Sequence, residues 1–184
     1  MTTEGTLLTA DDLLRLPDDG QRHELVRGEL RTMPPAGGEH GLIAGRAFRR
    51  IANFVEDEEL GFVFAAETGF RIFLNPDTVR APDVAFVAVD RFPDGRIPAR
   101  FPELAPDLVV EVVSPYDSAD NVDEKMADWI DAGVRMAIAV FPKGRRALVW
   151  RSRSDIRALK EQDLIDGGDV LPGFRCQVSE LFQR

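Results

Sequence analysis

The 184-residue chain has one cysteine, Cys176, and only two histidines, His23 and His40. It therefore cannot form an internal disulfide or a zinc site of the usual Cys/His spacing. No segment approaches the ~18 consecutive apolar residues of a membrane span, and no basic residue precedes Arg15 in the manner of a signal peptide. We expect a protein of a reducing compartment, the cytoplasm, with no membrane partner.

Positive charge is also scarce, because 23 Lys and Arg face 32 Asp and Glu and leave a net charge of −9. Non-specific binding to nucleic acids depends mainly on neutralising phosphates, so the net negative charge argues against a protein whose surface is covered with positive charge for such binding. The 44% hydrophobic and 30% charged residues are an ordinary balance for a folded chain. With no repeat or low-complexity tract, residues 1–184 are expected to form a single domain.

The pattern of apolar residues predicts helices and strands in alternating groups. A long amphipathic helix is predicted over residues 39–58, a second from Asp120 through Ala132, and a short one between Thr9 and Pro17. Strands are predicted at residues 23–26, 29–33, 62–74, 79–89, 107–114, 136–141 and 147–150. This order predicts an α/β fold in which a central mixed sheet is flanked by helices.

The valine-rich run Asp107–Ser114 carries a carboxylate, Glu111, in its middle. An unpaired buried carboxylate is costly, so it must shift its pKa, find a cation, or lie where the strand opens to solvent. The simple alternative is an edge strand in which the face that carries Glu111 is exposed to solvent. Because Val109 and Val113 share that face by the two-residue period, we favour a functional role for Glu111.

A second carboxylate, Asp83, follows Pro82 and enters the apolar run 84–87. Taken alone, Asp83 is explained by a turn or strand cap after proline. Two carboxylates on neighbouring strands would, however, suit Mg²⁺, which takes one or two carboxylates, several waters and substrate phosphates. Asp83 and Glu111 are therefore the candidate metal ligands.

Lys125 lies inside the apolar stripe of the second long helix, three residues after Val122 and four before Trp129. Considered alone, such a lysine can rest its stem on the core and keep its ammonium in water. Three charged residues on separate elements, each in apolar surroundings, instead indicate a functional cluster. His40 is a candidate phosphate contact, and a capping or core-edge role is the simpler alternative.

These residues belong to an ordered set of segments that resembles the Uma-type family of restriction-endonuclease-like proteins, a branch of the PD-(D/E)XK nuclease superfamily. The resemblance rests on Pro82-Asp83 followed by Glu111 in its valine-rich strand, and it spans residues 23–174. It implies a restriction-endonuclease-like α/β core. The matching segments are residues 24–30, 80–87, 106–115, 124–129, 132–134 and 171–174.

The resemblance also implies roles for single residues. Asp83 and Glu111 match the metal-binding acids, and Glu29 matches an N-terminal acid that helps to hold the metal or its waters. The family lysine normally stands two positions after the second acid, where this chain has Val113, and Lys125 occupies the matching place on the following helix. The strand after residue 133 lacks the Trp and the Val-Asp-Pro ending that the family often carries.

The implied activity is that of a Mg²⁺-dependent endonuclease, with Mn²⁺ as a substitute, which hydrolyses DNA phosphodiester bonds through Asp83, Glu111, Lys125 and Glu29. A homodimer is expected because two sites are the simple way to cut two strands. One alternative is a catalytically inactive DNA-binding or protein-interaction module on the same fold, which Val113 and the acidity support. Another is a structural homo-oligomer, which leaves the inward charges unexplained.

Charge is divided unevenly along the chain. Residues 103–132 contain nine acidic and one basic residue, whereas residues 135–160 contain eight basic and one acidic. An acidic metal-binding stretch followed by a basic stretch that could hold phosphates is compatible with a nuclease, although a solvated arginine face is common. We expect DNA to bind weakly without a divalent cation.

Overall fold

A six-stranded sheet forms the centre of the computed structural model, which describes residues 7–92 and 94–183. Positions 1–6, 93 and 184 of the expected domain lie outside the described part. The strand order of this sheet is β10-β9-β8-β7-β6-β3, in which β7 and β8 are parallel and the other neighbours antiparallel. The expected central mixed sheet is confirmed. Its strands are β3 (Gly61–Ala65), β6 (Val84–Ala88), β7 (Leu108–Val112), β8 (Met136–Phe141), β9 (Arg146–Trp150) and β10 (Ile156–Leu159).

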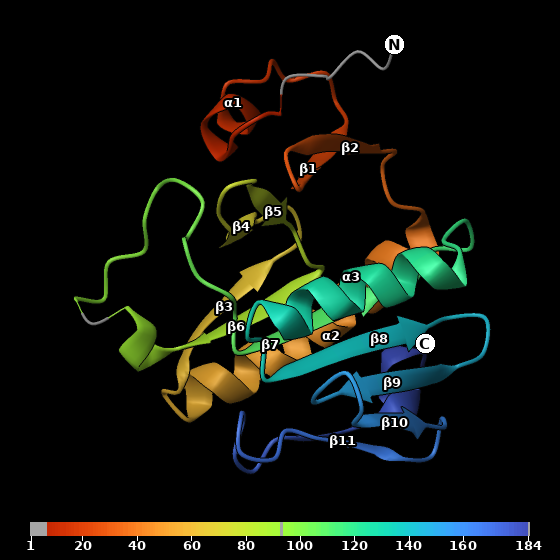
Figure 1. Cartoon of the computed structure of the whole chain (residues 1–184). Helices are drawn as coiled ribbons and strands as arrows, with labels where there is room; N and C mark the ends of the chain where they lie inside the picture. The colour runs from red at the N-terminus through yellow and green to blue at the C-terminus, as the bar shows by residue number, and fades with distance from the viewer. Residues whose placement is uncertain (1–6, 93, 184) are drawn as a thin grey trace.

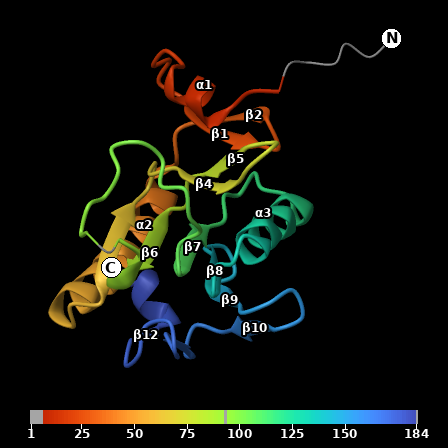
Figure 2. The same ribbon diagram turned by 60° about the vertical axis from the view of Figure 1, so that its left-hand side comes forward.

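Two helices sandwich this sheet, α2 (Gly38–Asp57) on one face and α3 (Ala119–Asp131) on the other, as Figure 2 shows. Side chains of β7 alternate between the faces: Val110 and Val112 join the core beneath α2, and Val109 joins the core beneath α3. Glu111 therefore faces α3, as the two-residue period predicts.

A smaller sheet lies above one end of the large one, beside the short helix α1 (Ala10–Leu14), at the top of Figure 1. Its order is β2-β1-β5-β4, with β1 (Arg22–Val26), β2 (Glu29–Met33), β4 (Phe70–Phe73) and β5 (Thr78–Arg80). Its core joins Leu13 of α1 to Leu25 and Val79. The C-terminal part adds a hairpin of β11 (Leu164–Asp166) and β12 (Arg175–Gln177), and two 3₁₀ turns are η1 (Val89–Arg91) and η2 (Val178–Leu181).

The structure corrects two predicted strands. Residues 62–74 and 79–89 each divide between the two sheets, because the chain turns at residues 66–69 and again at 81–83. Proline has no N–H for a strand ladder, so Pro82 marks the second crossing, and Asp83 stands at that crossing. Smaller corrections concern helix ends: Ser118 rather than Asp120 caps α3, and α1 ends at Leu14.

In the described part of the chain, no helix combines the length and the apolar character that crossing a membrane requires.

Asp77 links α1 to the small sheet through hydrogen bonds, so a substitution of Asp77 tests that packing. Its buried carboxylate accepts the Ala10 N–H and an Arg71 N–H, both at 2.8 Å. Burial raises the pKa of Asp77, but these donors outweigh burial and leave the pKa below its usual value. The carboxylate thus contributes stability above the unfolded pKa of about 3.9 and loses it as pH falls through the folded pKa.

We expect Asp77→Ala to lower the free energy of unfolding at pH 7 by about 2–3 kcal/mol, because a buried amide and a guanidinium lose their acceptor. Urea denaturation measures this loss. The matched control is Glu103, whose side chain is 65% exposed and pairs with the same Arg71. Glu103→Ala should lower the free energy of unfolding by under about 1 kcal/mol. Equal losses in the two variants would contradict the assignment.

Candidate active site

Lys125 joins the two sheets at one point. Its ammonium lies 3.1 Å from Glu24 Oε1 of β1 and 2.9 Å from Glu111 Oε2 of β7. The remaining oxygen of Glu111, Oε1, accepts the indole N–H of Trp129 at 2.9 Å. Lys125 and Trp129 are one turn apart on α3 and therefore hold both oxygens of the same carboxylate. Lys125 thus points inward, toward the acids.

Asp83 lies beside the same strand. Its Oδ2 accepts the Val112 N–H at 2.7 Å and lies 3.3 Å from Nε2 of His40. His40 belongs to the first turn of α2, but the N-cap is Gly37, which offers no side-chain cap. The capping role considered for His40 is therefore wrong, and its described contact is with Asp83. Within the described residues, His40 Nδ1 is buried without a hydrogen-bond partner.

Glu24 is a member of the cluster that the sequence analysis did not single out. It is 2% exposed and accepts the Ala81 N–H at 3.1 Å and an Arg80 N–H at 3.0 Å, besides its contact with Lys125. Arg80 also pairs with Asp128 of α3. The signal for Glu24 was its place before the apolar pair Leu25-Val26 in the strand 23–26, inside a segment that already carried the family resemblance.

Glu29 is placed apart from these contacts. It lies on β2, the outer strand of the small sheet, where its side chain is 66% exposed and pairs with Arg31. Among the described residues, no contact joins Glu29 to Asp83, Glu111 or Lys125. The structure thus brings together three of the four residues expected in the site, Asp83, Glu111 and Lys125, and adds Glu24 through its contact with Lys125.

The protonation of the cluster follows from burial and charge. Burial raises the pKa of Glu111 to about 7; Lys125 opposes this, and the negative charges of Asp83 and Glu24 add to it. The two adjacent carboxylates hold the pKa of Lys125 above its usual value despite burial. Burial also acts against ionised Glu24 and Asp83, but their donors leave both pKa values lowered. The cluster is short of positive charge.

That shortage bears on whether a metal ion fits here. In residues 7–92 and 94–183, no three or more His, Cys, Asp or Glu side chains are arranged to hold an ion, so any ion relies on a pair of carboxylates and on water. Mg²⁺ accepts such a set. Asp83 and Glu111 supply hard oxygen ligands, and a second positive charge beside Glu111 would favour its ionised form. The residues present fit a hydrated divalent cation.

A cavity of about 720 Å³ opens beside the cluster. Asp83 and His40 contribute to its wall, together with the loop that precedes β1 and one side of α2. Of the candidate acids, Asp83 is thus reached from a hollow between the small sheet and α2.

This fold agrees with the comparison with known proteins. A family model described as "Uma2: Putative restriction endonuclease" matches residues 10–179. The chain belongs to the Uma2 family. A solved structure titled as a putative nuclease belonging to DUF820 from Anabaena variabilis ATCC 29413 has a TM-score of 0.82 and 21% sequence identity, covering 95% of this chain and 97% of that one. No protein with curated annotation matches the chain.

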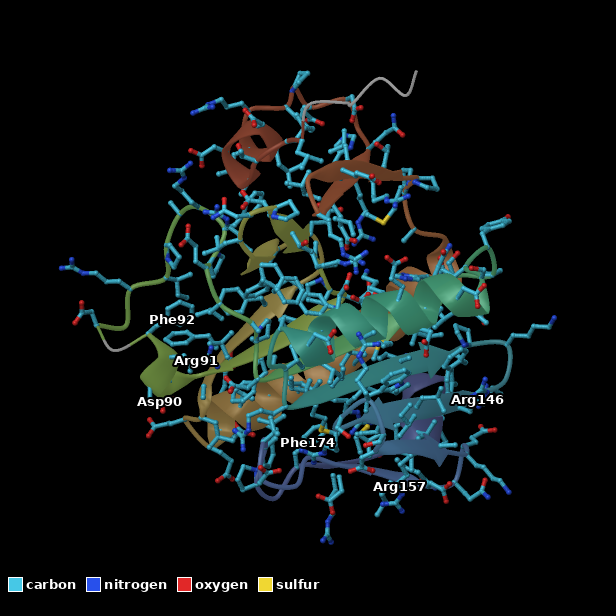
Figure 3. All side chains as sticks on the ribbon, viewed as in Figure 1. Asp90, Arg91, Phe92, Arg146, Arg157 and Phe174 are labelled. Atoms are coloured by element: carbon cyan, nitrogen blue, oxygen red, sulfur yellow. The ribbon has the colours of Figure 1, made fainter. Side chains whose placement is uncertain are left out.

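In this Uma2 chain, four of the eight basic residues of segment 135–160 pair with acids that lie outside the segment. Arg135 and Arg151 pair with Asp169, and Arg153 pairs with Asp131. Arg146 lies over the ring of Phe141, 4.1 Å from its centroid. Figure 3 places Arg146 and Arg157 at the lower right, on the side of the molecule away from the small sheet. The segment is thus engaged mainly in contacts within the chain.

The raised pKa of Glu111 predicts how stability depends on pH in metal-free buffer. Because the folded pKa of about 7 exceeds the unfolded value, the protonated carboxyl contributes stability that is fully present below about pH 4 and is lost as pH rises through about 7. Glu111→Gln removes this titration. Between about pH 5 and pH 8, we expect the free energy of unfolding of Glu111→Gln to rise relative to that of the wild type by on the order of 2–3 kcal/mol.

Urea denaturation at a series of pH values measures this difference. Glu103→Gln alters an exposed carboxylate and should follow the wild-type curve. Parallel curves for Glu111→Gln and the wild type would show that Glu111 titrates normally.

Proposed function

We propose that this chain is a divalent-metal-dependent nuclease that hydrolyses phosphodiester bonds of DNA, with Mg²⁺ or Mn²⁺ as its cofactor. The observation that carries the proposal is the convergence of Asp83, Glu111 and Lys125 beside a cavity, in a member of a family described as restriction endonucleases. When bound, the cation would supply an acidified water and charge stabilisation at the phosphate.

Each residue of the cluster has a distinct task in this proposal. Asp83 and Glu111 hold the cation. Lys125 offers its ammonium to the attacking water or to the charge that develops on the phosphate. Glu24 and Trp129 keep Lys125 and Glu111 in place, because each contacts one of them through a buried hydrogen-bonding group. His40 does the same for Asp83.

A homodimer remains a prediction here, since it follows only from the need to cut two strands. Sedimentation of the purified chain with and without DNA measures the oligomeric state.

Cleavage of labelled single- and double-stranded DNA tests the proposed activity. In Mn²⁺ or Mg²⁺, the wild type should cut DNA and EDTA should abolish cutting. Asp83→Asn, Glu111→Gln and Lys125→Met should each lower the rate at least about 100-fold, because each removes a charge next to the reacting phosphate. Glu58→Gln, beyond the far end of α2, is the matched control and should retain the wild-type rate.

Each variant is first compared with the wild type by thermal unfolding, so that misfolding is recognised. A wild type that binds metal and DNA without cutting either form would instead favour the inactive binding module. Undiminished cutting by Asp83→Asn or Lys125→Met would contradict the catalytic set.

A comparison of two glutamates tests which N-terminal acid serves the site. Glu24→Gln should lower the cleavage rate by about tenfold or more, since Lys125 loses one of the two carboxylates that position it. Glu29→Gln should have the smaller effect, because the Glu29 side chain is exposed and pairs with Arg31. The reverse order would restore Glu29 to the role that the family resemblance implies.

A further inference from the structure

Asp83 is reached through a cavity rather than across an open surface. The residue is 4% exposed, and it belongs to the wall of the 720 Å³ hollow between the small sheet and α2. This volume lies in the range of pockets that enclose ligands of the size of a nucleotide. A phosphate that approaches Asp83 must therefore enter the hollow together with the chemical groups attached to it.

Two glycines keep this hollow open. Gly41 and Gly45 are one turn apart on α2 and both line the cavity. A Cβ atom built on either would meet nothing within 4 Å, so neither glycine is needed for close packing inside the protein. Glycine weakens a helix interior relative to alanine. The free space beside this face of α2 thus suits an occupant that the chain itself does not provide.

The remaining wall has both a cationic and an apolar part. Arg22 lines the cavity, and no carboxylate of the described residues lies within ion-pair distance of its guanidinium. Apolar side chains supply flat surface for a sugar or a base: Leu13, Leu16, Met33, Phe48 and Phe101. Asp18, Asp19 and Glu67 also belong to the wall, so a phosphate needs a divalent cation to offset their charge.

We propose that this cavity holds an unpaired nucleotide next to the bond that is cut, so that the substrate is single-stranded DNA or the unpaired end of a duplex. The inference rests on the proposed nuclease function and narrows its substrate. An intact duplex keeps its bases stacked inside, so a nucleotide enters such a pocket from a single strand or after it leaves the stack. Arg22 contacts the phosphate, and the apolar wall packs against the base or sugar.

The test uses a fluorescein-labelled single strand of about 20 nucleotides, the same strand in a blunt duplex, and a duplex with an unpaired tail. Binding is measured by fluorescence anisotropy in Ca²⁺, and cleavage is measured in Mn²⁺. The wild type should bind the single strand and the tailed duplex at least about tenfold more tightly than the blunt duplex. Cleavage of the tailed duplex should fall in its unpaired part.

Two variants locate the binding in the cavity. Gly45→Trp fills the hollow and should weaken single-strand binding about tenfold or more, and Arg22→Gln should weaken it about fivefold. Leu42→Trp adds the same bulk to α2 at an exposed position that does not line the cavity, and its affinity should stay within about twofold of the wild type. Thermal unfolding checks each fold, and Gly41→Leu replaces Gly45→Trp if the latter is unstable.

Equal affinity for single strand and blunt duplex would overturn the inference, and so would unchanged binding by a folded cavity-filling variant. If such a protein still cuts DNA in a manner that requires Asp83 and Glu111, the proposed function stands and only the substrate is wrong. A wild type that neither binds nor cuts any of the three DNAs would refute both.

Discussion

The contact of one ammonium with two buried carboxylates holds the rest of the site together. Lys125 reaches Glu24 on the small sheet and Glu111 on the large sheet, so its position depends on both sheets at once. In a protein interior of low dielectric, removing one charge from such a set leaves the others uncompensated. The arrangement can therefore persist only where the strands and α3 fix all three groups, and this requirement links the fold to the site.

The chain crossing at Pro82 explains why the acids meet where they do. Each of the two long β-rich runs leaves one sheet and enters the other, and Asp83 lies at the second crossing, before β6. Its carboxylate is thereby presented to the backbone N–H of Val112, the residue next to Glu111. Two carboxylates that are 28 positions apart in sequence thus become neighbours through strand pairing.

Much of this could be predicted from the sequence, because α2 and α3 carry regular apolar periods, β8 is a continuous apolar run, and Glu111 shares a face with Val109. The division of residues 62–74 and of residues 79–89 between the two sheets could not be predicted, since a strand that changes sheets keeps its apolar pattern on both sides of the bend. The role of Glu24 in the cluster was not predicted for a related reason. Its partners lie 56 to 101 positions away in sequence, and only the fold brings them close to it.

The net negative charge, which seemed to argue against an enzyme that acts on nucleic acids, has to be considered locally, around Glu111, in the folded chain. Arginines of the basic segment pair with Asp131 and Asp169, so they do not balance the cluster around Glu111. Burial there raises the pKa of Glu111 to about 7; Lys125 opposes this, and the negative charges of Asp83 and Glu24 add to it. In the proposed nuclease, a divalent cation would offset the negative charge of these carboxylates, and a phosphate would bind after the cation. DNA would then bind weakly without metal.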